Sequence, residues 1–595
     1  MLRALEWLFA ASATGGCNRN FMKPSIRRHG ADPKNQDREP GARRSRHKEF
    51  PMISINRRSA LGLLGATAGT LILPRMAFSQ AKRPSITIAV QKITNNNSLD
   101  VYHEQSNVGE RIFFPNLWEG LILRDWMGNQ GPVPGLATEW KRIDDKTLEL
   151  KLRQGVKFHN GDEMTAEDVA FSFSKERVFG NTEPAGGKTI FEADHKPATA
   201  KELPATVPGV GRRLWPALAG IEIVDKYTVR LHNATPDVTL EGRLYSGGSQ
   251  ITNRRAWDEA ATFTEWSRKP ITTGPYMVGE YKPDVSLTLV AFDEYWGGRP
   301  PLEQIRFVEV PEVASRVNGL LSGEYDFACD LPPDQIAAVQ AAPGYEIQNS
   351  TIWNHRISVF NTQNEILANP LVRRAMTHAI DRQAIVDALW AGKTVIPAGL
   401  QFESFRNGDM FIEGWAPPAY DPNLAKDLLK QANYKGDAIP YRLLNNYYTN
   451  QTANGQIMVE MWKQVGLNVE IEMKENWAQI HDPAGVKGVR DWSASNTIND
   501  PITPMIVQFG PNGEVQQKKD WTNEEMNKLA VVMETSTDRA QRKKAIARML
   551  EICEREDPVY QVLHQNAVFT GMKSSLKWKA APAFAMDFRA ANWSI

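Results

Sequence analysis

Hydrophobic and charged residues alternate strictly over Leu148–Arg153, where three leucines are separated from one another by charged residues. This period of two predicts a β-strand with one buried face. Asn160-Gly161 follows and suits a tight turn, because glycine adopts positive φ without strain. Thr165 and Asp168 then have nearly the pattern of a capping box at the start of a helix. The stretch 116–173 therefore predicts a strand, a turn and a capped helix in succession.

Further strands are predicted in the first half of the chain, where alternating or β-branched residues recur in short runs. These runs are Pro84–Val90, a hairpin over Ile221–Asn233, Ser286–Phe292 and Ile305–Val310. Residues 295–300, between the last two runs, predict a turn that carries aromatic side chains. Residues 181–212 are rich in Gly, Pro, Ala and Thr and predict an irregular insertion.

Apolar residues at helical spacing characterise the second half of the chain. One such stripe, over residues 371–390, consists of Leu371, Ala375, Ala379, Ile385 and Leu389. The other predicted elements are a helix at Asn423–Gln431 that begins at Asp421-Pro422, a helix at Gln456–Val465 closed by Gly466, and a strand at Asn468–Met473. Alternating helices and strands are typical of α/β units. The contrast between the two halves predicts two lobes with a cleft between them, which is a common place for a ligand.

Residues 52–81 have the composition of an export signal. Arg57-Arg58 precede an apolar run from Ala60 to Leu73 that is too short to span a bilayer. Small residues at 77–81 then fit a cleavage site. Paired arginines before a weakly hydrophobic run resemble a twin-arginine signal, and an ordinary secretory signal is the alternative. Either signal predicts a periplasmic protein whose signal is cleaved.

The segment 1–51 precedes this predicted signal and is basic, polar and without periodicity. Because export signals stand at true N-termini, we interpret 1–51 as a non-native or disordered extension and Met52 as the start. A lipoprotein signal ending at Cys17 is the rival interpretation, but Thr14-Gly15-Gly16 lacks the usual apolar residue before such a cysteine.

Charge supports this division of the chain. Residues 1–81 hold 14 of the 70 basic and 5 of the 69 acidic residues, so the remainder carries a formal net charge of −8. That balance argues against a general nucleic-acid-binding surface. The remainder keeps Cys329 and Cys553, which we expect to stay unpaired, although their spacing alone does not decide it. The 17 tryptophans suit either a large core or an aromatic cleft.

Catalytic and metal-binding motifs are absent from the sequence. It contains no P-loop, no HExxH, no CxxC and no GxSxG, and residues 209–214 fail the dinucleotide pattern. His355 and His378 lie far apart with no ligand spacing, and Asp144-Asp145 falls in a predicted turn. We therefore expect a protein that is not an enzyme, with no catalytic residues, no cofactor and no metal. A secreted hydrolase stays as an alternative, since catalytic groups can be distant in sequence.

Several blocks in order resemble the family 5 extracellular solute-binding proteins, which serve ABC importers of dipeptides, oligopeptides, opines, nickel chelates and some sugars. The resemblance covers nearly all of residues 82–595. Its blocks are the stretch 116–173, Thr273-Gly274-Pro275-Tyr276, LLSGEYDFACDLPPDQ from Leu320, VFNTQNEILANPLVRRAMTHAIDRQAIV, YDPNLAKDLLKQANY and MWKQVGLNVEIE.

The resemblance implies a periplasmic-binding-protein-like α/β fold, with two lobes joined by hinge strands and a small domain inserted in the first lobe. Lobe I would comprise 82–116, 262–351 and 561–595, the inserted domain 117–261, and lobe II 352–560. A ligand that touches both lobes would favour their closed arrangement.

Two ionic anchors of the peptide-binding relatives are replaced by neutral residues here. Ser495 occupies the place where the resemblance implies a carboxylate for the peptide ammonium, and Asn445, with Arg442 nearby, lies where it implies an arginine. A buried ammonium without an anion is costly. The amide, hydroxyl, aromatic and acidic candidates for ligand contact are Asn107, Asn445, Tyr447, Trp477, Trp492, Ser495, Asn496, Asn499 and Asp500. A structural cap or ion pair is the alternative role for Asp500.

The resemblance implies a periplasmic substrate-binding component, a monomer that captures a peptide or peptide-like solute and delivers it to an inner-membrane ABC permease. An opine, an oligosaccharide or a cationic amine is the alternative cargo. A sensor subunit would use the same cleft and is a further alternative.

Overall fold

The computed structural model describes residues 82–180, 201–445, 447–482 and 484–594. By its internal contacts the chain divides into Met1–Ser79 and Gln80–Ile595, and all the described residues belong to the second unit. The predicted extension 1–51 and the predicted signal 52–81 lie outside the described residues. So does the first part of the predicted insertion, 181–200.

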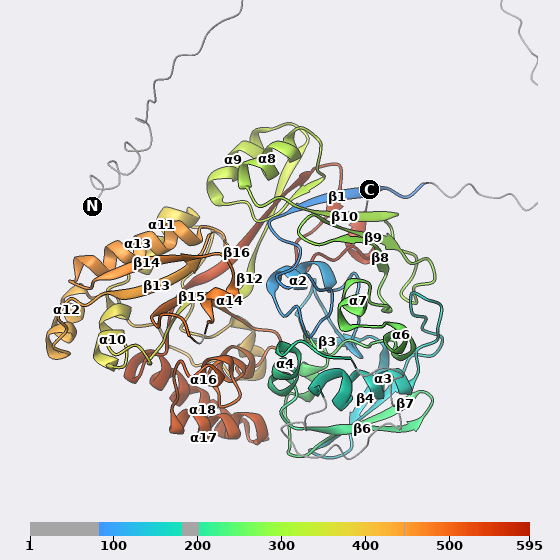
Figure 1. The fold of residues 1–595 in the computed structure, drawn as a ribbon, viewed down its shortest axis with the longest axis horizontal. Coiled ribbons are helices and arrows are strands. Elements are labelled where there is room, and N and C mark those ends of the chain that lie inside the picture. Colours follow the sequence, from blue (N-terminus) through green and yellow to red (C-terminus); the bar gives the residue numbers. More distant parts are fainter. Residues whose placement is uncertain (1–81, 181–200, 446, 483, 595) are drawn as a thin grey trace, which may run out of the picture. The chain divides into compact units, whose positions relative to one another are not determined.

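One mixed sheet of ten strands runs through the described residues (Figure 1). Its strands, in spatial order, are β14 (Val469–Lys474), β13 (Ile439–Leu444), β15 (Val489–Ser495), β12 (Tyr345–Phe360), β16 (Tyr560–Lys573), β11 (Phe327–Ala328), β1 (Ser85–Val90), β10 (Gln304–Glu309), β9 (Ser286–Ala291) and β8 (Tyr276–Lys282). The strands β13–β15 belong to one lobe, and β1 with β8–β11 belongs to the other. The chain therefore has the predicted α/β fold with two lobes.

The long strands β12 and β16 link the two lobes. They have 16 and 14 residues and pair antiparallel. Their register is interrupted where residues 352–354 of β12 lie opposite Asn566 alone, between the pairs Thr351–Ala567 and His355–Gln565. Bulges of this kind redirect side chains and are common beside binding sites. This one lies where the sheet passes from one lobe to the other.

The remaining strands of the described residues form three smaller sheets. A four-stranded antiparallel sheet contains β4 (Ala137–Arg142), β5 (Thr147–Leu152), β7 (Thr228–Asn233) and β6 (Leu218–Asp225). The two-stranded sheets are β2 (Ile122–Arg124) with β3 (Pro132–Pro134), and β17 (Lys577–Trp578) with β18 (Trp593–Ser594). All strands of the four-stranded sheet fall within the predicted inserted domain, whose boundaries stay a prediction.

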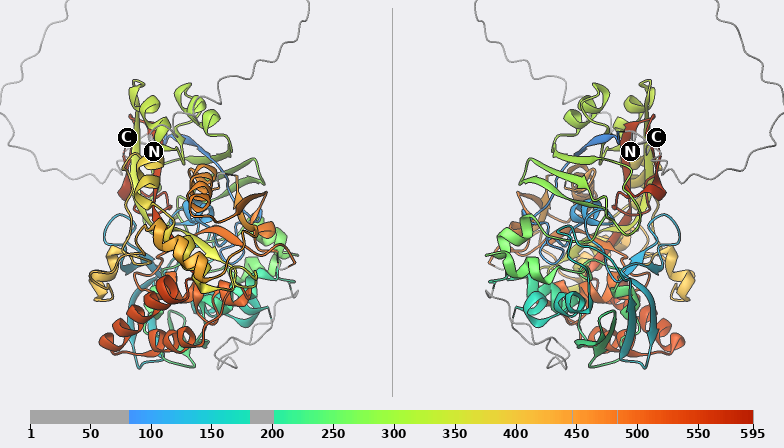
Figure 2. Two further views of the ribbon diagram at one scale, coloured as in Figure 1. Left: turned by 90° about the vertical axis from the view of Figure 1, so that its left-hand side faces the viewer. Right: turned by 90° about the vertical axis from the view of Figure 1, so that its right-hand side faces the viewer.

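Helices precede, connect and cover these sheets. Before β12 they are α2 (Asn107–Phe113), α3 (Ala166–Ser172), α4 (Thr206–Leu214), α5 (Leu240–Arg243), α6 (Arg254–Glu259), α7 (Phe263–Arg268), α8 (Val313–Leu321) and α9 (Pro333–Ala341). After β12 they are α10 (Pro370–His378), α11 (Arg382–Trp390), α12 (Pro422–Gln431), α13 (Gln451–Gln464), α14 (Trp477–Ile480), α15 (Val507–Phe509), α16 (Glu514–Gln517), α17 (Glu524–Thr535) and α18 (Arg539–Glu551). Two side views show α8 and α9 at the opposite end of the described chain from α17 and α18 (Figure 2).

Short 3-10 and π segments fill several connections. They are η1 (Lys175–Phe179), η2 (Glu403–Gly408), η3 (Ile502–Ile506), η4 (Ile552–Glu556) and η5 (Ala590–Asn592).

The strand–turn–helix prediction at 116–173 is confirmed. In β5 the leucines are buried, while Glu149 is half-buried and Lys151 is exposed. Gly161 has φ of +88° in the predicted turn. Thr165 caps α3, and both halves of its capping box with Asp168 are formed. The local pattern was sufficient here because each element is specified by adjacent residues.

The other predicted strands and the predicted turn are also present. The hairpin at Ile221–Asn233 corresponds to β6 and β7, and the predicted strands Pro84–Val90, Ser286–Phe292 and Ile305–Val310 correspond to β1, β9 and β10. The aromatic turn at 295–300 lies between β9 and β10, and its Tyr295 and Trp296 both donate hydrogen bonds to the buried Glu119.

Three predicted regions differ from the structure. The stripe at 371–390 is not one helix, because Asp381 caps a new helix through the backbone N–H of Ala384 and so separates α10 from α11. The irregular insertion predicted at 181–212 is wrong at its end, where α4 forms; Pro208 stands in its first turn, where proline is tolerated, and Gly211 packs closely on Val178. The helix predicted at 456–465 begins earlier, at Gln451.

Bulky residues fill two main cores rather than one. The larger holds β1, β8–β10, the four-stranded sheet and the helices α17 and α18, and the second holds α10–α13 with β13 and β14. Ten of the sixteen described tryptophans are buried, eight of them in these two cores, which favours packing over a general aromatic cleft. Cys329 and Cys553 are buried and unpaired, as expected.

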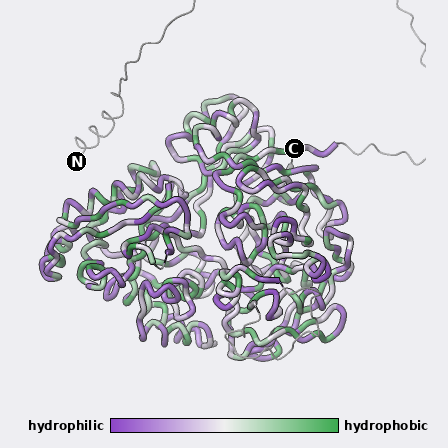
Figure 3. Tube along the Cα trace, viewed as in Figure 1, coloured by the Kyte–Doolittle hydropathy of each residue, from purple (hydrophilic) through white to green (hydrophobic). Residues whose placement is uncertain are grey.

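Within the described residues, no helix has both the length and the apolar character needed to cross a membrane. Figure 3 shows short hydrophobic and hydrophilic stretches interspersed along the trace.

Candidate functional site

Two neighbouring cavities lie beside the linking strands β12 and β16. Cavity 1 has about 470 Å³ of empty space and cavity 2 about 260 Å³, and both volumes include space open to solvent. Phe584 lines both of them. The two cavities therefore adjoin and form one candidate ligand site.

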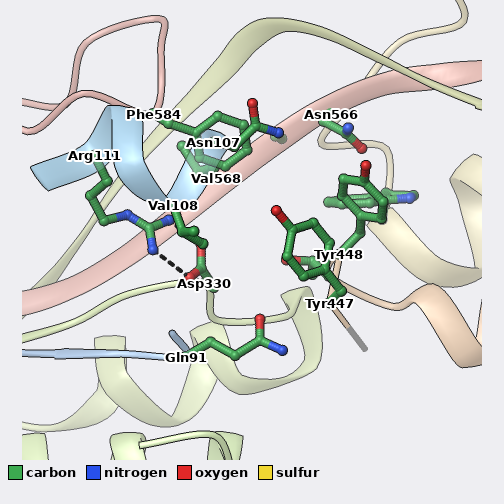
Figure 4. A pocket seen from close by; sticks show the side chains of 13 residues that line it. Gln91, Asn107, Val108, Arg111, Asp330, Tyr447, Tyr448, Asn566, Val568 and Phe584 are labelled. Carbon is green, nitrogen blue, oxygen red and sulfur yellow. Dashed lines mark hydrogen bonds and ion pairs between the residues drawn. The ribbon is translucent and has the colours of Figure 1, made fainter. Parts of the chain in front are cut away.

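Cavity 1 is lined from both lobes. Its lining residues are Gln91, Asn107, Val108, Arg111, Asp330, Trp390, Tyr447, Tyr448, Thr449, Asn566, Ala567, Val568 and Phe584. Figure 4 shows Asn107 and Arg111 of α2 on one side and Tyr447 with Tyr448 on the other. The side chains of α2 at 107, 108 and 111 share a face, because residues three and four apart in a helix are neighbours.

An aromatic group closes the lobe II side of cavity 1. The Tyr447 ring meets Tyr448 edge-on at 4.8 Å and Trp477 at 5.1 Å between ring centroids. The amide of Asn95, in the loop after β1, donates a 3.4 Å hydrogen bond to the Tyr447 hydroxyl. Tyr447 thus joins the two lobes at the edge of the cavity.

The charges of cavity 1 are already paired. Arg111 donates to both oxygens of Asp330 at 2.8 and 2.5 Å, and the pair is largely buried (Figure 4). Asp330 holds this position with φ of +56°. The Tyr448 ring is covered by Arg356, whose guanidinium carbon lies 3.7 Å from the ring centroid and which is paired with the buried Asp491. Because these charges are balanced, cavity 1 suits polar and aromatic contacts with a ligand.

Cavity 2 carries two charged side chains. It is lined by Glu110, Arg124, Ile352, Trp353, Asn354, Ser495, Asn496, Thr497, Pro582, Ala583 and Phe584. Arg124 ends β2 and is buried, and its guanidinium lies near the rings of Trp126 and Trp353 at 5.2 and 5.4 Å. Burial lowers the pKa of Arg124, an effect that Glu110 partly offsets. Burial raises the pKa of Glu110, while Arg124 and Arg111 act in the opposite direction.

Amides and hydroxyls cover the wall formed by β12, β15 and β16. Asn354 lies in the bulge of β12 and donates to Ser495 at 2.7 Å and to Ser493 at 3.1 Å. Asn566 of β16 donates in turn to the side-chain oxygen of Asn354. Because Asn566 lines cavity 1 while Asn354 and Ser495 line cavity 2, this network connects the two walls.

Four of the predicted contact residues line the cavities. Asn107 and Tyr447 line cavity 1, and Ser495 and Asn496 line cavity 2. The Asn496 amide donates to Ser404 at 2.9 Å, whereas its buried side-chain oxygen has no partner among the described residues. The structure thus brings residues from distant parts of the sequence to one place, as the prediction requires. Their contact with a ligand stays a prediction.

The remaining predicted contact residues line neither cavity. Asn445 is exposed, and Trp477 packs on Tyr447 from outside. Trp492 stands between Asp491 and Ser493 on β15, so its side chain points away from the face of Ser493 and Ser495, towards His481 and Arg490.

Asn499 and Asp500 have structural contacts instead. Asn499 donates to the carbonyl of Gln130 at 3.1 Å. Asp500 accepts from the backbone N–H of Ile502 and forms an ion pair with Arg542, with both of its oxygens 2.8 Å from the Arg542 nitrogen. These contacts favour the alternative, structural role for Asp500. Arg442, the neighbour of the expected arginine anchor, is buried and donates to the carbonyl of Ile480 at 2.6 Å, away from both cavities.

Sequence reasoning missed the charged residues of the site: Glu110, Arg111, Arg124 and Asp330. Arg111 and Asp330 lie 219 residues apart, and no local pattern links them. A signal existed only for α2, where Glu110 and Arg111 follow the predicted contact residue Asn107 by one helical turn.

Among the described residues, no group of three or more His, Cys, Asp or Glu side chains is placed to hold a metal ion. The chemistry of the site is hydrogen bonding, aromatic contact and charge.

Comparison with known proteins gives the family. The profile of the bacterial extracellular solute-binding proteins, family 5 (middle), matches residues 131–514. The dipeptide-binding protein of Escherichia coli (strain K12) is 23% identical over 471 residues, which cover 76% of this chain and 84% of that protein. Heme-binding protein A of Haemophilus influenzae (strain ATCC 51907 / DSM 11121 / KW20 / Rd) is 24% identical, with 77% and 84% covered.

Solved structures show the same fold. The dipeptide-binding protein of Pseudoalteromonas sp. SM9913 in complex with Met-Leu has a TM-score of 0.73 at 21% identity, covering 85% of this chain and 99% of that one. The binding protein AgaA of A. tumefaciens R10 in complex with agropinic acid has a TM-score of 0.69 at 20% identity, covering 84% and 96%. At these identities the likeness establishes the two-lobed α/β architecture.

Proposed function

Because the chain belongs to the family 5 bacterial extracellular solute-binding proteins, we propose that it is the substrate-binding component of an ABC importer. In this role it captures a peptide or peptide-like solute in cavities 1 and 2 and delivers it, unaltered, to a permease in the inner membrane. The protein acts as a monomer in the periplasm, after cleavage of a twin-arginine signal within 52–81. Its lobes and inserted domain follow the boundaries expected from the sequence.

One observation carries this proposal: cavity 1 is lined from both lobes, by α2 on one side and by Tyr447–Thr449 on the other. A solute that contacts both sides binds the closed arrangement better than the open one, and this difference shifts the population towards closure. The strands β12 and β16 are the elements that bend, because they link the lobes. The permease would then recognise the closed form.

The choice of cargo follows from the walls of the cavities. Peptides present alternating amide donors and acceptors, which match the side chains of Asn107 and Asn566 in cavity 1. An opine, an oligosaccharide or a cationic amine is the second candidate cargo. The aromatic pair Tyr447 and Tyr448 favours it, because such rings stack on sugars and attract cations.

A thermal-melting screen tests the proposal. Dipeptides, longer peptides, opines, oligosaccharides and amines are each added to the purified protein, and a true ligand raises the melting temperature. Binding at 100 times the Kd stabilises the native state by about 2.7 kcal/mol. A shift with opines or sugars and none with peptides would exclude peptide cargo.

Two further measurements separate a carrier from the alternatives. Mass spectrometry of the ligand after prolonged incubation should recover it intact, whereas a hydrolase would leave fragments. Uptake of the labelled ligand by cells should fall when the protein is deleted. Normal uptake combined with a lost transcriptional response would identify a sensor.

A further inference from the structure

The charged side chains of cavity 2 come from two elements, β2 and α2. Arg124 is the last residue of β2, and Glu110 lies on α2. Both line the cavity beside Phe584. Neither belongs to the positions where the sequence led us to expect charged anchors, which hold Asn445 and Ser495.

Arg124 is a buried cation without a carboxylate partner. Its relative exposure is 5%. Among the described residues it donates one hydrogen bond, from Nη2 to the carbonyl of Asn496 at 3.2 Å, and its Nε has no acceptor. A buried charge that lacks a counter-ion and hydrogen bonds is unfavourable. The arrangement is therefore incomplete without an anion.

Other buried arginines of the described chain do not share this situation. Arg111 and Arg177 are paired with Asp330 and Asp100. Arg316 donates to four backbone carbonyls. Arg442 also has a free Nε, but it lines neither cavity. Arg124 combines an unmet donor with a place in a cavity wall.

Glu110 is the complementary group. It is half-buried, and its carboxylate has no hydrogen bond or ion pair among the described residues, although Arg124 and Arg111 attract it from further away. The buried side-chain oxygen of Asn496, also on the cavity wall, has no donor either. These two groups offer acceptors to a cation.

We propose that cavity 2 binds both charged ends of a short zwitterionic solute such as a dipeptide, with Arg124 donating to its carboxylate and Glu110, assisted by the Asn496 oxygen, accepting from its ammonium group. This inference rests on the proposed carrier function and names the ligand class of the same site. The side chains of the solute extend past Phe584 into cavity 1. The ionic anchors missing at Asn445 and Ser495 are thereby replaced by residues of β2 and α2.

The test compares wild type with Arg124→Gln and Glu110→Gln, and with Arg255→Gln on the surface as the matched control. The probes are Met-Leu, its C-terminal amide and its N-acetyl derivative, together with sodium acetate at constant ionic strength. Calorimetry gives the Kd, and thermal melting reports the ligand-free stability. Removing one partner of a buried charge pair typically weakens binding about 30-fold or more.

Three results support the inference. Arg124→Gln weakens binding of the free acid about 30-fold or more, amidation weakens wild type to the same degree, and the two losses are not additive, since both remove one interaction. Glu110→Gln shows the same relation to N-acetylation. Ligand-free Arg124→Gln melts no lower than wild type, because the substitution removes an unpaired buried charge; a merely structural arginine would lower the melting temperature.

Results that would refute the charged site differ from those that would refute the proposed carrier function. Equal binding of a peptide by wild type and Arg124→Gln would overturn the inference and leave the carrier role intact. If Met-Leu does not bind, acetate gives the decision. Thermal protection of wild type but not of Arg124→Gln supports the anion site, and equal behaviour of the two overturns it. If Arg124→Gln does not fold, binding of the amidated and N-acetylated peptides to wild type decides. Undiminished binding of both derivatives would refute the charged site.

Discussion

Thr165 shows how one side chain defines the start of an element. It accepts from the backbone N–H of Glu167, and Asp168 accepts from the backbone N–H of Thr165 at 2.9 Å. Replacing Thr165 with Ala removes the cap of α3, and we expect a loss of about 1 kcal/mol in the free energy of unfolding. Urea denaturation measures this loss. Thr138→Ala, at an exposed position of β4, is the control, and an equal loss in both variants would contradict a capping effect.

The hydroxyl of Tyr447 supports a prediction about binding, because it accepts a hydrogen bond from Asn95 of the other lobe. Tyr447→Phe keeps the ring and removes this bond. A typical hydrogen bond contributes about 0.5–1.5 kcal/mol, so we expect roughly two- to tenfold weaker binding of the ligand found by melting, with little change in stability. Calorimetry measures the Kd of both proteins. Tyr434→Phe, whose hydroxyl donates to Asp437 outside both cavities, should bind normally.

Individual site residues could be predicted only where the resemblance supplied them. Asn107, Tyr447, Ser495 and Asn496 were identified in this way and line the cavities. Arg124 and Glu110 could not be identified, because an unpaired charge becomes apparent only after the partners of its neighbours are known. Trp492 was predicted from its residue type, and the alternation of β15 directs its side chain away from the face of Ser493 and Ser495; its contact with a ligand stays a prediction.

At the scale of elements, Gly274 controls how the loop before β8 packs. A Cβ at this position would lie 2.3 Å from the backbone oxygen of Leu117, which also accepts a hydrogen bond from Thr272. Since backbone cannot yield as a side chain does, we expect Gly274→Ala to cost about 3 kcal/mol of stability or more. Denaturant unfolding tests this.

Gly209 offers the matched glycine. It lies in α4, and a Cβ there would meet nothing within 4 Å. Gly209→Ala should therefore leave stability unchanged or raise it by up to about 1 kcal/mol, because alanine favours helix. A comparable loss in both variants would show that the contact with Leu117 is not the cause.

Helices and strands could be predicted where adjacent residues specify them. β5 and α3 follow from alternation and a capping pair, and α12 begins at Asp421 as expected. The boundary between α10 and α11 was not predicted, because the apolar stripe continues across it while Asp381 starts a new helix. The bulge at 352–354 of β12 has no sequence signal, since it depends on the pairing with β16.

For the molecule as a whole, buried histidines predict its response to acid. Burial lowers the pKa of His159 and His355 to about 4, and that of His481 and His564 to about 3. In the unfolded chain these rings bind protons below about pH 6.5, whereas in the fold they stay neutral. Their contribution to stability is complete above pH 6.5 and is lost as the pH falls towards 4, by about 1.4 kcal/mol per pH unit for each ring.

Buried carboxyls change the pH dependence of stability in the opposite direction; burial raises the pKa of Asp168, for example, to about 6. The histidine effect is therefore measured by comparing a variant with wild type. His355 donates to the carbonyl of Gln401 and stacks on Phe402. His355→Gln should reduce the loss of stability between pH 6.5 and pH 4.5 relative to wild type, in urea titrations at several pH values. The same substitution at the partly exposed His378 is the control, and identical slopes for wild type and His355→Gln would contradict the prediction.

Phe584, which lines both cavities, acts as a partition with a consequence for the length of cargo. We expect a short solute to bind on one side of the ring and a longer one to displace the ring from its packing. The Phe584 ring would thus limit the length of the solute that binds. Phe584→Ala would remove the ring and join cavities 1 and 2. Among peptides of two to five residues, the variant should therefore bind the longer ones with relatively higher affinity than wild type does.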